Sequence, residues 1–243
     1  MTRTFRIQGE DVTVCPPIPD DVTVLVIRDT RLTSLPALPS GLTRLDCGGN
    51  QLTSLPTLPS GLTGLYCSSN QLTSLPSLPS GLTELVCWGN QLTSLPALPS
   101  GLTYLSCEDS QLTSLPILSR GLIHLYCRCN DLMSLPALPS GLTELDCYSI
   151  KLTSLPSLPS GLNELYCSGN PIVWCERIKD AKRAGINPKK IARLLRLACK
   201  VIARQDAIEL IQQNCDHWLD APITNDGRLG ILLRTGMCEN AGY

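Results

Sequence analysis

Hydrophobic and polar positions follow one 20-residue pattern along most of the chain. Its unit is L-T-x-L-x-C-x-x-N-Q-L-T-S-L-P-x-L-P-S-G, and residues 32–51 are followed by a nearly identical copy over residues 52–71. Within x-L-x-C-x, apolar and polar residues alternate, which predicts a β-strand with Leu45 and Cys47 pointing inward. A repeat of this length predicts a solenoid in which each copy forms one turn.

The register of the copies predicts nine parallel strands, spaced about 4.8 Å apart. One period before the regular copies, Leu25 and Ile27 occupy the inward positions, and a divergent first copy places Phe5 and Ile7 there. A divergent terminal repeat is typical of a solenoid cap. We therefore expect strands centred near residues 6, 26, 46, 66, 86, 106, 126, 146 and 166.

The remaining fixed residues predict how the chain leaves and re-enters each strand. Asn50 stands at the turn off the strand, where its side chain would satisfy buried backbone groups of adjacent turns. Thr30, Ser110 and Ile150 interrupt this asparagine column, and we expect a local irregularity at Ile150, which has no polar group. The L-P-x-L-P segment predicts polyproline II on the convex side, because proline fixes φ and lacks an N–H. The serine–glycine pair at residues 40–41 would then turn the chain into the next strand.

The cysteines recur with the repeat. The chain has 13 of them, and seven are spaced one period apart: Cys47, Cys67, Cys87, Cys107, Cys127, Cys147 and Cys167. An odd total and a regular inward column favour buried thiols that behave as small hydrophobic groups, and hence a reducing compartment. The N-terminal residues do not resemble a signal peptide, and no apolar run is long enough to span a membrane. We expect a cytoplasmic protein, with the cytosol of a host cell as one possible location.

The repeat resembles that of the short-repeat bacterial leucine-rich effectors of the YopM and IpaH type. The shared features are the 20-residue period and L-P-x-L-P, as at residues 35–39, and the resemblance covers roughly residues 2–170. It implies a leucine-rich-repeat horseshoe with a concave parallel sheet. Residues 171–243 are too short for the catalytic domain of the IpaH ubiquitin ligases, and the N-terminal helical hairpin usual in these effectors is missing. The cysteine at the strand position is also similar to the cysteine ladders of internalin-type repeats.

Three outward positions in each copy form columns on the predicted concave face. The first column is Val24, Arg44, Gly64, Glu84, Tyr104, His124, Glu144 and Glu164. The second is Val26, Asp46, Tyr66, Val86, Ser106, Tyr126, Asp146 and Tyr166. The third is Arg28, Gly48, Ser68, Trp88, Glu108, Arg128, Tyr148 and Ser168. Five of the six tyrosines and one of the three tryptophans lie in these columns.

These aromatic side chains predict a surface that binds a protein or peptide. Tyrosine and tryptophan bury a large area with few rotamers to freeze, so they contribute strongly to interfaces. The predicted partner-binding residues are Tyr66, Glu84, Trp88, Tyr104, His124, Tyr126, Asp146 and Tyr148. The alternative is that solvent-facing positions of a recent repeat array have drifted without any partner.

Three sequence features suggest other chemistry, and each has a simpler explanation. Cys107-Glu108-Asp109 resembles the Cys-x-Asp motif of the IpaH ligases, but Cys107 belongs to the inward column. His124 and Cys127 would point to opposite sides of their strand, so they cannot share a tetrahedral metal ion. Cys215 and His217 adjoin in a tail that offers little scaffold for catalysis. We therefore expect no catalytic residue, no metal and no cofactor.

The periodicity changes after residue 170, so we divide the chain into an array at residues 1–170 and a C-terminal cap with a basic helical segment at residues 171–243. Residues 172–174 would cover the last repeat. The Asn187-Pro188 pair predicts a helix start, followed by a second helix over residues 207–214 or by one long helix.

Charge is segregated between these parts. Residues 1–170 carry 8 basic and 13 acidic side chains, whereas residues 171–205 carry 10 basic and 2 acidic ones. The basic stripe between Lys189 and Arg204 fits a solvated helix face, contact with an acidic partner or with the array itself, or, more weakly, an anionic membrane. Nucleic acid is not expected, because the stripe has no interleaved aromatic residue and the formal net charge of the chain is −1.

Together these features predict a non-enzymatic scaffold that binds a protein or peptide on its concave face, as a host-interacting protein of a pathogen or virus would. The alternative is an adaptor or remnant of an IpaH-like ubiquitin-ligase system without its catalytic domain. A purely structural array is a third hypothesis. The pattern does not predict the partner or the oligomeric state.

Overall fold

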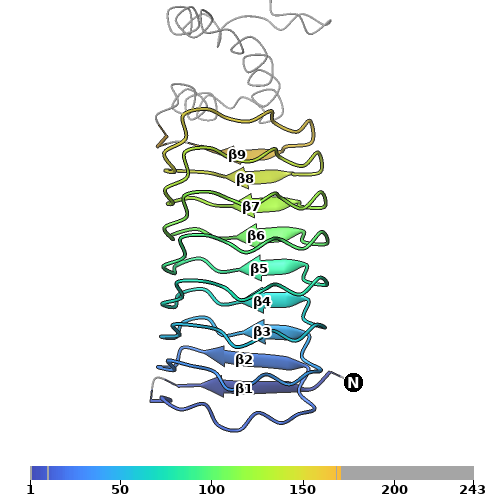
Figure 1. The fold of residues 1–243 in the computed structure, drawn as a ribbon, viewed down its shortest axis with the longest axis vertical. Coiled ribbons are helices and arrows are strands. Elements are labelled where there is room, and N and C mark those ends of the chain that lie inside the picture. The colour runs from blue at the N-terminus through green and yellow to red at the C-terminus, as the bar shows by residue number, and fades with distance from the viewer. Residues whose placement is uncertain (1, 10, 168, 171–243) are drawn as a thin grey trace, which may run out of the picture. The chain divides into compact units, whose positions relative to one another are not determined.

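The computed structural model describes residues 2–9, 11–167 and 169–170, which form a solenoid with one strand per turn (Figure 1). The strands make one parallel nine-stranded sheet in chain order. Their bounds are β1 Thr4–Gln8, β2 Val24–Arg28, β3 Arg44–Asp46, β4 Gly64–Tyr66, β5 Glu84–Val86, β6 Tyr104–Ser106, β7 His124–Tyr126, β8 Glu144–Asp146 and β9 Glu164–Tyr166. Each strand lies within about one residue of its predicted centre, so the expected register is confirmed. The predicted C-terminal cap and helices lie outside the described residues.

Strand pairing follows the repeat without a shift. Leu45 pairs with Leu65, and Leu65 with Leu85, so each residue lies beside its equivalent 20 positions later. β1 and β2 pair over five residues, from Thr4 with Val24 to Gln8 with Arg28. Because equivalent residues align, each kind of side chain forms a continuous column across the sheet.

The core lies between the strands and the proline segments. Leu42, Leu45, Cys47 and Leu52 are fully buried, and their equivalents repeat this packing from turn to turn. All seven cysteines of the predicted column are buried. Burial raises the pKa of the Cys67 and Cys107 thiols well above the ordinary value, so these groups stay protonated and act as small apolar side chains.

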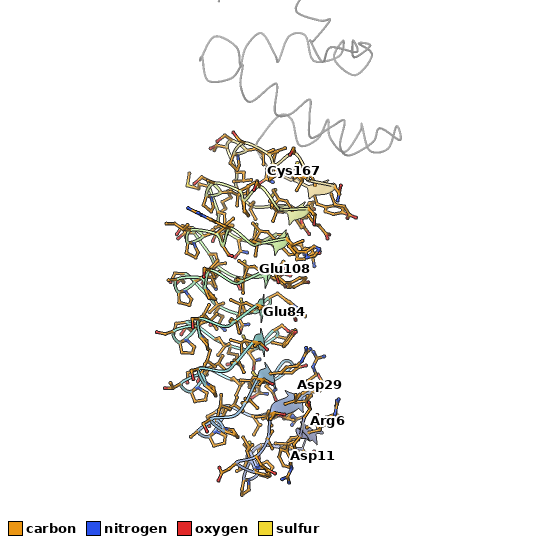
Figure 2. The ribbon with its side chains drawn as sticks, turned by 90° about the vertical axis from the view of Figure 1, so that its right-hand side faces the viewer. Arg6, Asp11, Asp29, Glu84, Glu108 and Cys167 are labelled. Carbon is orange, nitrogen blue, oxygen red and sulfur yellow. The ribbon has the colours of Figure 1, made fainter. Side chains whose placement is uncertain are left out.

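The proline segments return the chain on the opposite side of the core, and Figure 2 shows the array edge-on, with the strands on the side that carries Arg6, Glu84 and Glu108. These segments contain neither helix nor strand, as expected where proline removes backbone donors. Each ends in a tight turn, in which the Leu42 amide donates to the Pro39 carbonyl at 3.1 Å. The predicted turn at residues 40–41 is therefore confirmed.

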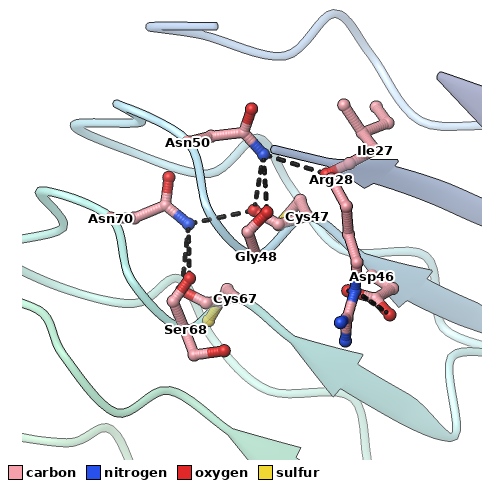
Figure 3. Close-up of polar contacts among 9 residues, drawn as sticks. All are labelled: Ile27, Arg28, Asp46, Cys47, Gly48, Asn50, Cys67, Ser68 and Asn70. Atoms are coloured by element: carbon pink, nitrogen blue, oxygen red, sulfur yellow. Dashed lines mark hydrogen bonds and ion pairs between the residues drawn. The ribbon is translucent and has the colours of Figure 1, made fainter. Parts of the chain in front are cut away.

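Asparagine side chains connect neighbouring turns, as Figure 3 shows for Asn50 and Asn70. The Asn70 amide nitrogen donates to the carbonyls of Cys47, Cys67 and Ser68 at 2.9–3.2 Å. Its oxygen accepts from the Leu52 amide at 2.9 Å. One buried side chain thus satisfies four backbone groups from two turns that no water could reach.

The interruptions of the asparagine column have local consequences. No described residue accepts a hydrogen bond from the amide of the buried Leu92. The serine side chain at position 110 is too short to reach this amide, and its hydroxyl instead donates to the Glu108 carbonyl at 3.5 Å. Ile150 is buried, and the Leu152 amide donates to its carbonyl in a tight bend, so the predicted irregularity is present. At the remaining interruption, the Thr30 hydroxyl donates a hydrogen bond to the side-chain oxygen of Asn50 in the next turn.

Two further columns complete the frame. Threonine hydroxyls donate along the start of the strands, as from Thr63 to the Thr43 carbonyl at 3.0 Å. Two residues past the inward cysteine position, the backbone has a positive φ in every described turn from Asp29 onward, with φ of 68° at Gly49 and 53° at Cys129. At Gly49 an added Cβ would lie too close to the Asp29 carboxylate, so a larger residue there would require that side chain to move, in addition to the strain of a positive φ.

Replacing Cys87 by serine should lower the free energy of unfolding by about 1–3 kcal/mol, because it buries a hydroxyl among leucines. Cys87→Val is the matched control, since it keeps an apolar side chain of similar size, and should cost less. Urea denaturation followed by circular dichroism measures both. Equal stability of Cys87→Ser and wild type would contradict the buried assignment.

Replacing Ser110 by asparagine should raise the free energy of unfolding by about 1 kcal/mol or more, because the longer side chain supplies the missing acceptor for the Leu92 amide. Flanking Asn90 and Asn130 show that the site accommodates this side chain. Ser110→Ala should differ little from wild type. An asparagine variant no more stable than the alanine variant would refute this interpretation.

Candidate functional site

The outward side chains of the strands form the surface that we call the strand face. From β3 onward each turn contributes three positions to it: the first and last residues of the strand and the second residue after it, as Glu84, Val86 and Trp88 do around β5. In the longer β1 and β2, the first, third and fifth residues of the strand occupy these positions. All-parallel sheets are normally covered on both sides. Among the described residues, no helix or strand packs over the outward side of this sheet.

At the N-terminal end of the strand face, the charged groups pair with one another. Arg28 donates from Nε to both carboxylate oxygens of Asp46 at 2.8 Å. The Arg44 guanidinium lies 4.0 Å from the ring centroid of Tyr66, and the Tyr66 hydroxyl donates to Glu84. Burial and this hydrogen bond raise the pKa of Tyr66 to about 12. The absence of a side chain at Gly64 leaves room for the Tyr66 ring to lie back over the strand.

The centre of the strand face is an aromatic cluster of three rings on β6 and β7. Tyr104 lies 5.7 Å from His124 and 5.5 Å from Tyr126, measured between ring centroids, with tilted planes. His124 and Tyr126 are nearly parallel at 6.5 Å. These are favourable aromatic geometries, and they hold the rings in fixed positions. Tyr126 donates from its hydroxyl to Glu144 at 2.6 Å, and burial together with this bond raises the pKa of Tyr126.

Three further large aromatic side chains on the strand face are partly exposed. The exposed fractions are 40% for Trp88, 46% for Tyr148 and 45% for Tyr166. Exposed aromatic area on an uncovered sheet face is a common mark of a protein-binding surface.

Glu108 is a partly buried carboxylate on the same face. It accepts a hydrogen bond from the Ser106 hydroxyl at 2.5 Å. Burial raises the pKa of its carboxyl, and this outweighs the opposing effects of Ser106 and of nearby Arg128. A carboxylate whose charge is opposed by burial is a candidate for a role outside folding.

The predicted partner-binding residues fall into three groups in the structure. Tyr104, His124 and Tyr126 are brought together, while Trp88 and Tyr148 stand exposed beside them. Tyr66 and Glu84 contact each other, but Tyr66 is covered by Arg44 and so differs from the open aromatic residue that its column suggested. Asp146 accepts from the Tyr148 amide at 3.1 Å.

Sequence reasoning did not select three residues of this surface. Tyr166 occupies an outward column and is as exposed as Tyr148, so its position was a sufficient signal. Glu108 was considered only for its resemblance to a catalytic motif. Glu144 was assigned to a column without a role, although its pairing with Tyr126 follows from the register.

The other chemistry considered from the sequence finds no support in the described geometry. Cys107 is fully buried, and a protonated thiol there is not a nucleophile. His124 lies among the outward rings while Cys127 is buried inside, as expected. Within the described part of the chain there is no group of three or more histidine, cysteine, aspartate or glutamate residues placed to hold a metal ion. Cys215 and His217 lie outside that part. No helix among the described residues is long and apolar enough to cross a membrane.

Replacing Glu108 by glutamine should stabilise the protein at pH 7. The folded state raises the pKa of Glu108 above its ordinary value near 4.5, so the folded state binds this proton more tightly than the unfolded state does. Stability from this group is therefore lost as pH rises through the folded pKa. Glutamine removes the charge and keeps an acceptor for Ser106. Urea denaturation from pH 4 to pH 7 should show an advantage for Glu108→Gln that grows with pH. An advantage independent of pH, or a loss of stability at pH 7, would contradict this account.

Comparison with known proteins supports the solenoid assignment. A family model described as leucine-rich repeats in two copies matches residues 60–100, while no curated protein matches the sequence. YopM from Yersinia enterocolitica is 37% identical, with a TM-score of 0.64 over 65% of this chain and 35% of that chain. YopM from Yersinia pestis is 34% identical, with a TM-score of 0.63 over 65% of this chain and 46% of that chain. The present chain thus spans less than half of either YopM chain.

A leucine-rich-repeat domain of a Shigella effector is covered more completely. It is 32% identical, with a TM-score of 0.61 over 70% of this chain and 78% of that domain. The chain therefore belongs to the leucine-rich-repeat family and carries a repeat domain of the YopM and IpaH type.

Proposed function

We propose that the protein is a binding scaffold whose strand face docks another protein. The observation that carries this proposal is the exposed aromatic surface of Trp88, Tyr148 and Tyr166 beside the fixed cluster of Tyr104 and Tyr126. These residues occupy outward positions of the strands, whereas the inward leucines and cysteines repeat almost unchanged. Rigid aromatic side chains around a defined centre supply binding energy at low entropic cost.

The relatives favour a partner from a host cell. The Yersinia pestis protein is described as a leucine-rich effector, and the Shigella domain belongs to an effector. By analogy, this protein would act in the cytosol of a host cell on a protein found there. The analogy concerns the class of partner only, because the outward residues that would contact it vary within the repeat frame.

The proposal is tested by affinity capture from a lysate of cultured eukaryotic cells, with the full chain as bait. A Trp88→Ala, Tyr104→Ala, Tyr126→Ala variant should lose its specific partners at least about tenfold, because buried aromatic anchors each contribute about 2 kcal/mol or more. Quantitative mass spectrometry measures the loss, and circular dichroism confirms that the variant is folded.

The matched control removes exposed apolar groups from elsewhere on the array. Ile117 and Met133 are 89% and 63% exposed, lie outside the strands, and can both be changed to alanine. This variant should retain every specific partner. If wild type and both variants capture the same proteins, the strand face is not the docking site, and the segment between residues 189 and 204 becomes the next candidate.

A further inference from the structure

Charge is divided between the two ends of the strand face. β1 to β3 contribute Arg6, Arg28 and Arg44 but only one acid, Asp46, which Arg28 neutralises. Around β5 to β9, by contrast, the basic residue at the outward positions is Arg128, against the acids Glu84, Glu108, Glu144, Asp146 and Glu164. The aromatic cluster and the exposed aromatic residues lie in this acidic half. A partner that covers it must bring positive charge or leave several acids uncompensated.

The N-terminal half shows how this surface holds a guanidinium. Arg44 stacks on the Tyr66 ring at 4.0 Å, and the Arg28 Nε–H is shared between the two carboxylate oxygens of Asp46. The β5–β9 half repeats the same receptor groups, tyrosine rings beside carboxylates, as in Tyr126 with Glu144 and Tyr166 with Glu164. No arginine of the described residues stacks on the Tyr126 ring. Cation–π contact and a carboxylate together suit an incoming arginine, or less strongly a lysine.

The carboxylate of Glu108 gives a second, independent reason. It lies among Ser106, Tyr104 and Arg128, with burial opposing its charge. A glutamine at this position would satisfy Ser106 without that penalty. The charge is therefore costly to the free protein and would be useful to a complex in which a cation reaches it.

The dimensions of the acidic half limit the size of the ligand. β5 to β9 span four inter-strand steps of about 4.8 Å each, or about 19 Å. An extended chain crossing the strands covers this length with about six residues. A short linear segment of a partner is thus long enough to occupy the whole acidic half.

We propose that the segment bound on the β5–β9 half of the strand face is an extended, arginine-rich stretch of a protein partner. Its guanidinium groups stack on the tyrosine rings and pair with Glu108 and Glu144. This inference rests on the proposed docking function and adds the chemical class of the partner.

The test is fluorescence anisotropy with fluorescein-labelled nine-residue peptides and the full-length protein. Four peptides share an alternating serine frame and differ at the other positions, which are arginine, lysine, glutamine or glutamate. The arginine peptide should bind tightest, the lysine peptide more weakly, and the glutamine and glutamate peptides at least about tenfold more weakly than arginine. Binding of the arginine peptide should weaken as salt rises from 50 to 300 mM.

Two double variants with the same change of net charge locate the site. Glu108→Gln, Glu144→Gln should weaken the arginine peptide about tenfold, because both carboxylates are removed while their hydrogen-bond acceptors remain. Asp11→Asn, Asp20→Asn changes two exposed acids outside the strands and should alter affinity less than twofold. Equal effects of the two variants, or equal binding of all four peptides, would overturn the proposal.

Two outcomes separate this inference from its alternatives. If lysate capture depends on Trp88, Tyr104 and Tyr126 but the arginine peptide does not bind, the docking face stands and the basic partner is refuted. The segment at residues 171–205 is itself basic. If the wild type fails to bind but Lys189→Gln, Arg193→Gln, Arg196→Gln restores binding of the arginine peptide, the occupant is this segment of the chain and not a partner.

Discussion

The bridging hydrogen bonds of the asparagine side chains are the constraint on which the array depends. Each turn must bend sharply off its strand, which exposes backbone carbonyls and amides to the apolar core. Asn70 satisfies such groups in its own turn and in the preceding one, so it fixes the bend and the stacking together. The 20-residue period is the chain length that returns to this point, and the register of the sheet follows from it.

This arrangement separates folding from recognition. Leucines, cysteines and asparagines form the frame from inside, and the outward positions contribute little to it, so they are free to vary. The exceptions are informative. The Tyr66 ring lies in the space left by the missing side chain of Gly64 and contacts the Arg44 guanidinium. In this part of the strand face, the outward side chains therefore contact one another. Burial opposes the charge of Glu108, and a carboxylate in such a position is a candidate for a role in binding.

The sequence was sufficient to predict the structural features that recur with the 20-residue period. The positions of β1 to β9, the buried cysteines, the turn after Pro39 and the irregularity at Ile150 all follow from period and alternation. It was not sufficient to predict features that depend on contacts between the variable outward side chains of different repeats. The stacking of Arg44 on Tyr66 and the burial of Glu108 depend on rotamers across three strands, which no single repeat encodes.

The column of residues with positive φ could be predicted only in part. Glycine marks it at positions 49, 89 and 169, but Asp109, Cys129 and Ser149 adopt the same conformation and hide the pattern. In the candidate site, the alternation of the strands predicted which side chains face outward. It did not predict which of them are exposed, because neighbouring side chains cover Asp46 and Ser106.

Hydrogen–deuterium exchange of individual leucine amides, resolved by NMR, tests the central role of the asparagines most directly. The amides of Leu52, Leu72 and Leu112 are bonded to asparagine oxygens and should exchange slowly. Leu92 and Leu132, which face Ser110 and Ile150 in the column, have no such acceptor among the described residues and should exchange faster, although all five residues are equally buried. Equal protection of all five amides would show that the turns are held by something other than these side chains.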